Sequence, residues 1–354
     1  MAKKVLMKGN EAIAEAAILS GCRHYFGYPI TPQTEIAAYM AKRMPQIGGV
    51  FLQAESEVSA INMVIGASAS GVRTMTSSSS PGISLKSEGI SFLAGCDLPA
   101  FVVNIQRGGP GLGGIQPSQS DYFQATRSIG HGDFRLLVLA PESVQEMASL
   151  TMKGFYLADK YRMTCMLLAD GTMGQMMEPV VLEEMTTETI EKPWSLTGTN
   201  MQRNHNIVNS LSLDAAELER MNFSRFERYQ QVQDNECMWE DYLMEDAEIC
   251  VVGFGIAARI AKNAIVEARK QGIKAGMIRP ITLWPFPNDR LLEATKQCKA
   301  FLSVELNMGQ MIDDIRLATH CKRPVLLCNR AGGMIMSPEE VLAKINEANN
   351  VKGE

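Results

Sequence analysis

The sequence lacks the residue patterns that mark several large classes of protein. Its 8 cysteines include no Cys-x-x-Cys pair, so we expect no iron–sulfur, zinc or other metal site within this chain. It has no run of about 18 apolar residues, and its start at Met1 lacks the pattern of a signal peptide, so we expect no membrane association. A net charge of −5 without a Lys/Arg cluster argues against a nucleic-acid partner. Unpatterned cysteines are typical of a reducing compartment, and we expect a cytoplasmic protein.

Signatures of common hydrolases and nucleotide-binding proteins are absent too. The sequence contains no G-x-S-x-G, H-E-x-x-H or Walker motif. A glycine-rich stretch follows Arg107, but it has no Lys and Ser/Thr at the spacing of a phosphate-binding loop. The candidate functional residues therefore lie elsewhere, mainly where predicted strands end.

What the sequence does have is a regular alternation of strand and helix patterns. Its 354 residues, 46% of them apolar, are enough for two domains with real cores. Six apolar runs in the first part, separated by helical patterns, predict a parallel sheet covered by helices on both faces: residues 23–30, 49–53, 72–77, 98–105, 134–140 and 163–169.

The alternation stops and then resumes. Residues 176–245 form a polar, turn-rich connector that ends in one long helical pattern from Asp214 to Tyr242. From Ala247 onwards, short apolar runs and helical patterns alternate again. We therefore predict an α/β domain at residues 1–175, a connector at 176–245, and a second, smaller α/β domain at 246–354.

Glu57 is the first candidate functional residue. Residues 49–53 are predicted to be a buried strand, and Glu57 opens the helix that follows. Ligands of open α/β sheets bind at the carboxyl ends of the strands, which is where this carboxylate would lie. Gly66-Ala67, nine residues later, would let the helix approach another element closely. The neighbouring Glu55 is explained by a favourable interaction with the helix dipole alone.

A second candidate is the stretch Tyr28-Pro-Ile-Thr-Pro32, which follows the first predicted strand. Thr31 is a good N-cap and Pro32 suits a first helical position, so we predict a helix start there. Free backbone N–H groups at such a start can bind an anion. The alternative is that these residues only cap a helix.

Two further candidates follow later strands. The run Ser77–Ser80 offers hydroxyls and amides to an anion, although it is equally well explained as a turn. Arg107 directly follows a buried strand, where a guanidinium can bind a carboxylate through two parallel hydrogen bonds. The alternative for Arg107 is a structural salt bridge.

A rival signal lies in the second predicted domain. Gly253-Phe-Gly255 follows a strand and opens a helix, as a dinucleotide-binding fingerprint does. The next strand ends in Arg279 rather than in the acid that binds the ribose of NAD, and an arginine there would suit the 2′-phosphate of NADP. NADP binding through this domain is therefore an alternative function.

Together, the Tyr28–Pro32 string, the spacing from Glu57 to Gly66 and the position of Arg107 resemble the α subunit of 2-oxoacid:ferredoxin oxidoreductases. The resemblance implies an α/β fold with a pyrimidine-type, parallel-sheet thiamine diphosphate domain, followed by a domain similar to the C-terminal domain of transketolase. It also implies roles for single residues. Glu57 would hydrogen-bond the aminopyrimidine ring, Thr31 and Arg107 would bind the substrate carboxylate, and the remaining cofactor contacts would come from Tyr28, Pro29 and Ile30.

The same resemblance implies that the active site is shared between chains. Ala169-Asp170-Gly171 is similar to the Gly-Asp-Gly of thiamine enzymes but lacks its first glycine and the downstream Asn-Asn. The diphosphate, Mg²⁺ and iron–sulfur clusters would then belong to a β subunit or other partners, with a γ subunit and a ferredoxin-like subunit completing the complex.

The substrate is predicted from one loop. Residues 109–124, which include the apolar Leu112 and Ile115, resemble the members that convert 3-methyl-2-oxobutanoate and coenzyme A to an acyl-CoA and CO₂, with electrons passed to ferredoxin. The alternatives are 2-oxoglutarate or pyruvate as substrate, or a non-catalytic structural subunit in which Glu57 only interacts with a helix dipole.

Overall fold

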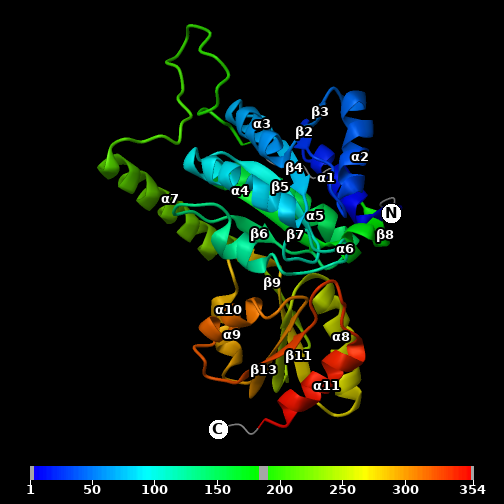
Figure 1. The fold of residues 1–354 in the computed structure, drawn as a ribbon. Helices are drawn as coiled ribbons and strands as arrows, with labels where there is room; N and C mark the ends of the chain where they lie inside the picture. Colours follow the sequence, from blue (N-terminus) through cyan, green and yellow to red (C-terminus); the bar gives the residue numbers. More distant parts are fainter. Residues whose placement is uncertain (1–3, 183–189, 352–354) are drawn as a thin grey trace.

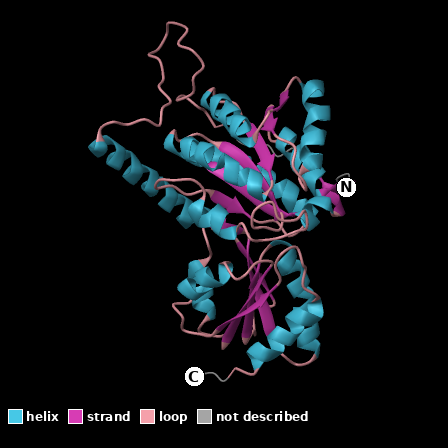
Figure 2. Cartoon of the chain, in the orientation of Figure 1, coloured by secondary structure: helices cyan, strands magenta, loops and turns pink. Residues whose placement is uncertain are grey.

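The computed structural model describes residues 4–182 and 190–351, and two large sheets form its framework (Figure 1). A seven-stranded sheet lies in the upper part of Figure 1 and a five-stranded sheet in the lower part, each with helices on both faces (Figure 2). Within the described ranges, no helix has the length and apolarity needed to cross a bilayer. The predicted α/β class is confirmed.

The first sheet has the strand order β12-β6-β7-β5-β4-β2-β3. The six predicted runs are all present, and neighbours among them pair in parallel as expected. They are β2 (His24–Gly27), β3 (Val50–Gln53), β4 (Thr74–Ser78), β5 (Ala100–Gln106), β6 (Leu137–Leu139) and β7 (Thr164–Asp170).

Helices cover this sheet on both faces because its central strands are apolar on both. Along β5, Phe101 and Val103 pack into one core cluster, whereas Val102 packs into the other. The first cluster also takes side chains from α1 (Gly9–Leu19), α2 (Thr34–Arg43) and α5 (Val144–Tyr161), and the second from α3 (Glu57–Ala69) and α4 (Ser80–Gly95).

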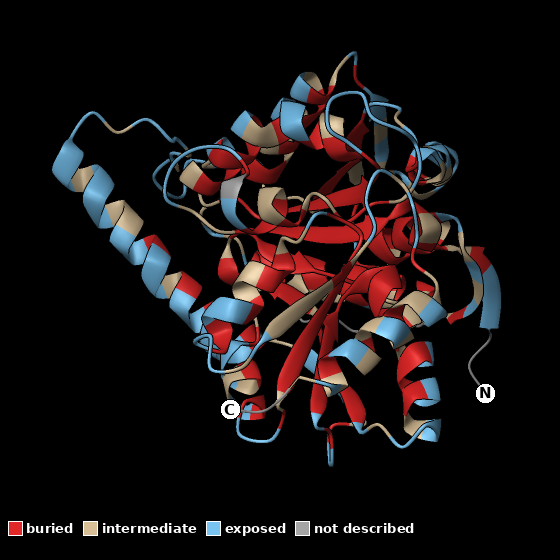
Figure 3. Ribbon diagram, turned by 60° about the horizontal axis from the view of Figure 1, so that its bottom comes forward, coloured by how far each residue is buried: buried red, intermediate tan, exposed pale blue. Residues whose placement is uncertain are grey.

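The second sheet repeats this plan on a smaller scale, in the order β14-β13-β10-β11-β9. Its strands are β9 (Trp239–Tyr242), β10 (Ile249–Gly253), β11 (Ala275–Pro280), β13 (Ala300–Glu305) and β14 (Val325–Asn329). Its helices are α8 (Gly255–Lys270), α9 (Asn288–Ala294), α10 (Met311–Ala318) and α11 (Pro338–Asn349). Buried residues fill the central strands of both sheets and the helix faces that cover them (Figure 3).

Other elements connect the two sheets. The long helix predicted in the connector is α7 (Ala215–Glu236), much of whose surface is exposed (Figure 3). Strand β12 (Thr282–Trp284) comes from the later part of the chain, yet it pairs antiparallel with β6 at the edge of the first sheet. Residues 183–189 of the connector lie outside the described residues, and the domain boundaries remain a prediction.

The smaller elements are β1 (Lys4–Lys8), β8 (Met177–Val181), α6 (Gly171–Gln175), η1 (Met44–Ile47) and η2 (Gln124–Ser128).

Two local predictions near Glu57 are wrong. Strand β3 is present but not buried, because it lies at the open edge of the sheet. Gly66 permits no close approach within the described chain, since a Cβ at that position would have no atom within 4 Å. The close contacts of α3 come instead from the glycines of α4.

Candidate active site

Glu57 is the first residue of α3, and its helix start is well defined. Ser56 is the N-cap, and its hydroxyl accepts a hydrogen bond of 3.2 Å from the Ser59 backbone N–H. The Glu57 residue is only 5% exposed. Among the described residues, no group donates a hydrogen bond to its carboxylate. Glu57 is therefore a buried acid at a sheet edge with its hydrogen-bonding capacity unused.

Glu55 differs from Glu57 in each respect. It is exposed, and it accepts a hydrogen bond from the Ser59 hydroxyl, which holds the pKa of Glu55 below its usual range. Its position and partner fit the interpretation of Glu55 as a surface acid beside a helix start.

Gly82 in α4 gives the Glu57 carboxylate its space. A Cβ at Gly82 would lie 2.5 Å from Glu57 Oε1 and 2.1 Å from Ser78 Oγ, so any larger residue there would displace these two side chains. The Ser78 hydroxyl beside it is buried and has no hydrogen-bond partner within the described part of the chain, and the same holds for Ser79. Buried hydroxyls normally find partners, so unpaired ones at a sheet edge indicate a place for a ligand.

The four serines do not form the turn that was the alternative explanation. Ser77 and Ser78 lie on β4, Ser79 is the N-cap of α4, and Ser80 is its first residue. The Ser80 hydroxyl accepts a hydrogen bond of 3.0 Å from the Arg107 backbone N–H. This segment therefore links Glu57 to Arg107.

Arg107 is buried, and it holds backbone rather than an acid. Its Nη1 donates to the Thr31 carbonyl at 3.0 Å and its Nη2 to the Leu112 carbonyl at 3.1 Å, whereas its Nε finds no partner among residues 4–182 and 190–351. No carboxylate of the described chain pairs with it, so the salt-bridge alternative is wrong. A buried guanidinium without a counter-charge is suited to binding an anionic ligand.

The structure places Thr31 beside Arg107 but not at a helix start. Helix α2 begins at Thr34 with Gln33 as its N-cap, so the prediction that Thr31 caps a helix is wrong. The buried Gln33 side chain explains the shift, because it accepts from Ser77 Oγ at 2.6 Å and donates to the Tyr28 carbonyl at 3.3 Å. Gln33 thereby holds the exposed segment Tyr28–Thr31 against the end of β4, a role that no sequence pattern indicated.

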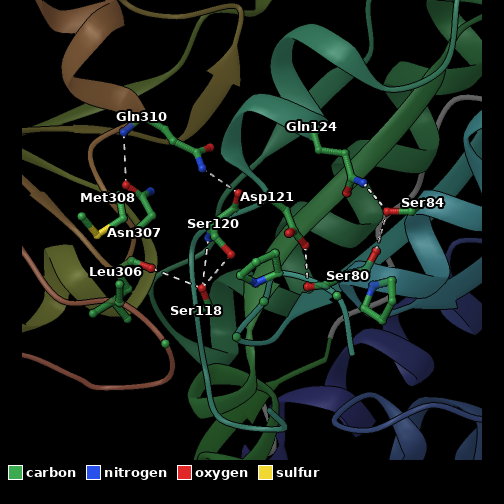
Figure 4. A pocket seen from close by; sticks show the side chains of 17 residues that line it. Ser80, Ser84, Ser118, Ser120, Asp121, Gln124, Leu306, Asn307, Met308 and Gln310 are labelled. Atoms are coloured by element: carbon green, nitrogen blue, oxygen red, sulfur yellow. Dashed lines mark hydrogen bonds between the residues drawn. The ribbon is translucent and has the colours of Figure 1, made fainter. Parts of the chain in front are cut away.

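A cavity of about 720 Å³ opens next to these residues, between the two parts of the chain (Figure 4). Ser80, Ser84, Asp121 and Gln124 lie on one side of Figure 4, with Asn307, Met308 and Gln310 on the other. Glu57, Thr31 and Arg107 do not line this cavity themselves, but Ser80 and the segment after Arg107 connect them to it.

Asp121 is the acid of the cavity. It hydrogen-bonds Ser80 Oγ at 2.6 Å and accepts from Asn104 Nδ2 at 2.9 Å. Burial raises the pKa of Asp121 above its usual range, while these two hydrogen bonds oppose the rise. No sequence pattern points to Asp121, since a single acid in a polar loop has no distinctive pattern.

The dinucleotide-like start of α8 is closed by the first part of the chain. Gln119 Nε2 donates to the Phe254 carbonyl at 2.8 Å, and Asp170 accepts a backbone hydrogen bond from Ile256. Arg279, proposed for a 2′-phosphate, is 2% exposed and pairs with the carboxylates of Glu142, Glu146 and Glu240. The NADP alternative is therefore wrong.

Asp170 is likewise occupied within the chain. Its Oδ1 accepts from the backbone N–H of Thr172 at 2.9 Å and of Met173 at 3.1 Å, which caps α6. Burial nevertheless raises the pKa of Asp170 to about 6. No group of three or more His, Cys, Asp and Glu side chains that could hold a metal ion occurs in the described ranges.

Two protein families match nearly the whole chain. Residues 15–236 match the family described as pyruvate flavodoxin/ferredoxin oxidoreductase, thiamine diphosphate-binding. Residues 247–341 match the pyruvate:ferredoxin oxidoreductase core domain II. The first of these matches contains Glu57, Thr31 and Arg107.

Two curated relatives are similar along nearly their full length. The ketoisovalerate oxidoreductase subunit VorB of Methanothermobacter thermautotrophicus is 50% identical over 343 residues, 97% of either chain. The 2-oxoglutarate synthase subunit KorA of Methanothermobacter marburgensis is 34% identical over 378 residues, covering 98% of this chain and 99% of the relative.

Solved structures share the fold. The 2-oxoglutarate:ferredoxin oxidoreductase from Magnetococcus marinus, with 2-oxoglutarate, coenzyme A and succinyl-CoA bound, has a TM-score of 0.89 at 27% identity. The match covers 99% of this chain and 66% of that one. A split-gene transketolase has a TM-score of 0.61 at 13% identity and is similar in fold alone.

Proposed function

Because the chain belongs to the 2-oxoacid:ferredoxin oxidoreductases, as their α subunit, we propose that its complex oxidises 3-methyl-2-oxobutanoate, also called ketoisovalerate. The acid and coenzyme A would give the acyl-CoA, CO₂ and a proton, and two electrons would reduce ferredoxin. The observation that carries the proposal for the site is the buried Glu57 carboxylate, which no hydrogen bond of the described chain satisfies. Identity of 50% to a ketoisovalerate oxidoreductase subunit supports the choice of substrate.

The residues around Glu57 fit the aminopyrimidine half of thiamine diphosphate. They combine an unbonded carboxylate, the unpaired buried hydroxyls of Ser78 and Ser79, and the space left by Gly82. Glu57 would hold a proton at a pyrimidine ring nitrogen, and Tyr28, Pro29 and Ile30 would flank the ring. When bound, the cofactor supplies the nucleophilic carbon and the electron sink for loss of CO₂.

Arg107 and Thr31 would bind the carboxylate of the substrate. The Arg107 guanidinium keeps Nε unpaired and has no acidic partner among the described residues, and its Nη1 already holds Thr31 in place. Anchoring the carboxylate there fixes the orientation of the 2-oxo carbon, and such positioning is a large part of enzymatic rate enhancement.

The cavity favours an acid with one carboxylate. The residues that line it include Asp121 but no Lys, Arg or His. The second carboxylate of 2-oxoglutarate would find no cation in this lining, and Asp121 would repel it. Because Leu306 and Met308 contribute apolar surface to the same cavity, it suits a branched aliphatic side chain.

A partner subunit would supply the diphosphate site, Mg²⁺ and iron–sulfur clusters, and γ and ferredoxin-like subunits would complete a cytoplasmic complex. Exposed apolar side chains on the elements around Glu57 support such a contact, because apolar surface of this kind is typical of interfaces. They are Tyr28, Leu52, Val58, Leu85, Leu112 and Ile115.

The test is to produce the chain with its partner subunits and to compare three acids. We expect coenzyme A-dependent ferredoxin reduction with the highest kcat/KM for 3-methyl-2-oxobutanoate, ahead of pyruvate and 2-oxoglutarate. A higher value with 2-oxoglutarate would overturn the substrate assignment. Full activity of Glu57→Gln in the same complex would instead support a structural subunit.

A further inference from the structure

Three residues of α4 form a stripe against the start of α3. Gly82, Lys86 and Gly89 follow the i, i+4, i+7 spacing of one helix face. Gly82 lies against the Glu57 carboxylate, and a Cβ at Gly89 would lie 2.4 Å from Ile61 Cγ2, one helical turn beyond Glu57. The two glycines let α4 approach α3 so closely that Lys86, between them, is enclosed.

Lys86 is fully buried, at 0% exposure, which is rare for a lysine. Its Nζ donates to the Glu57 carbonyl at 3.4 Å, and no carboxylate of the described residues forms an ion pair with it. The charge that acts on its ammonium is that of the Glu57 carboxylate. Glu88 on the same helix points to solvent, and Asp121 is hydrogen-bonded to Ser80 and Asn104.

A buried ammonium without a close ion pair weakens a fold, and an apolar side chain would fill the same space without that cost. Burial lowers the pKa of Lys86 to about 8, and the Glu57 charge opposes the shift. Lys86 therefore keeps a positive charge beside Glu57 at neutral pH and loses it as the pH rises above about 8. Packing alone gives no reason for a lysine here, so its charge needs a function.

We propose that Lys86 is a positioning residue that acts through Glu57: its Nζ holds the Glu57 backbone carbonyl at the start of α3, and its charge balances that of the Glu57 carboxylate while this carboxylate exchanges a proton with the cofactor ring. The proposal rests on the function proposed above. It adds a residue that contacts neither substrate nor cofactor and that controls the acid from the side facing the protein interior.

The test uses two substitutions in the reconstituted complex. Lys86→Met removes the charge and keeps most of the volume, whereas Lys86→Arg keeps a charge that does not titrate below about pH 12. We expect Lys86→Met to lower kcat about tenfold, to change KM for the 2-oxoacid less than threefold, and to weaken thiamine diphosphate binding measured by fluorescence titration of the apo complex. We expect Lys86→Arg to remain active above pH 8, where the wild type loses activity.

Leu93→Met is the matched control, because it alters a buried side chain of α4 away from Glu57. The double variant Lys86→Met/Glu57→Gln should be no less active than Glu57→Gln alone, since Lys86 acts only through Glu57. The proposal would be overturned if the double variant lost as much activity as the two single losses combined, or if Lys86→Met kept the wild-type pH profile. In both cases Glu57→Gln alone would still be strongly impaired, so the proposed function would stand. If Lys86→Met fails to assemble, the pH profile of Lys86→Arg decides alone. The proposal would be overturned if the activity of Lys86→Arg fell above pH 8 as steeply as that of the wild type. Retained activity in Glu57→Gln would instead remove the proposed function itself.

Discussion

Two glutamates, one near the carboxyl ends of the strands of each sheet, show what separates a functional acid from a structural one. Glu305 ends β13 and is fully buried; its carboxylate accepts from Ser303 Oγ and, at 2.7–3.0 Å, from the backbone N–H groups of Gln310, Met311 and Ile312. Glu57 is almost as buried, yet no group of the described chain hydrogen-bonds its carboxylate. Glu305 fastens the start of α10, and Glu57 remains available to something outside the chain.

Two of the buried arginines, Arg279 and Arg107, differ in the same way. Arg279 donates to Glu146 and Glu240. Burial alone would lower the pKa of Arg279, but the neighbouring acids outweigh burial and raise the pKa above its usual value. Arg107 donates only to two backbone carbonyls and keeps one N–H unused. Arg279 and Glu305 of the second sheet therefore hold the molecule together, whereas Arg107 and Glu57 beside the first sheet keep hydrogen-bonding capacity unused within the described chain.

The largest effect expected is on Glu57. Glu57→Gln in the assembled complex should lower kcat on the order of 10²-fold or more, because the side chain loses its acid–base function. Glu305→Gln should instead destabilise the complex by about 1–3 kcal/mol, because an amide cannot accept all four hydrogen bonds. Steady-state assays and thermal melting measure both. If Glu57→Gln and Glu305→Gln lost activity equally when both complexes were fully folded, the two acids would not differ in function.

The next largest effect separates the two arginines. Arg107→Met should raise KM for the 2-oxoacid about 10- to 100-fold, as expected when one or two charge-assisted hydrogen bonds to the carboxylate are lost. Arg279→Met should leave KM within a factor of about two while lowering the thermal midpoint, because it leaves carboxylates without their buried partner. An unchanged KM in Arg107→Met would show that this arginine is structural after all.

A smaller effect is expected for the glycines of α4. Gly82→Ala places a Cβ against Glu57 Oε1 and Ser78 Oγ, and it should weaken thiamine diphosphate binding about tenfold. Gly89→Ala creates a comparable clash with Ile61, away from the carboxylate, and should lower stability with little change in cofactor affinity. Titration of the apo complexes decides between the two. Similar affinities in both variants would mean that Gly82 serves only helix packing.

The smallest effect concerns Asp170, the acid at the end of β7 that accepts a backbone hydrogen bond from Ile256 at the start of α8. Because burial raises its pKa from 3.8 to about 6, its stabilising contribution is fully present below about pH 4 and is lost as the pH rises through 6. Asp170→Asn can still accept backbone hydrogen bonds but does not ionise. The thermal midpoint of the variant minus that of the wild type should therefore increase by about 2–5 °C from pH 4 to pH 7, because only the wild type is destabilised by ionisation of Asp170. A difference that does not depend on pH would contradict this.

The sequence predicts the framework of the molecule because the framework depends on local patterns. Apolar runs such as residues 98–105 identify the central strands, and the carboxyl ends of parallel strands meet at one edge. That geometry brings the segment after β2 and Arg107 together, although they are far apart in sequence. The exposure of β3 is not predictable in this way, because a run of four residues does not reveal whether a strand lies at the edge of a sheet.

The parts of the site that the sequence did not reveal depend on side chains that have no pattern of their own. Gln33 shifts the start of α2 by reaching into the end of β4, and Gln119 joins the two sheets by bonding to Phe254 and Leu306. Neither residue differs in sequence from an ordinary surface glutamine. Lys86 left a trace, since a lysine between Ile83 and Ile90 interrupts the apolar face of α4. That interruption is informative only once the neighbour across the face is known.

The antiparallel edge strand β12 has a consequence for engineering. Residues that follow the connector complete the border of the first sheet beside β6. A truncated protein that stops before Thr282 would expose the unpaired backbone of β6, and such bare borders promote aggregation. A version of the first sheet produced by itself would therefore need to include β12, or carry charged substitutions on β6 that prevent pairing with other chains.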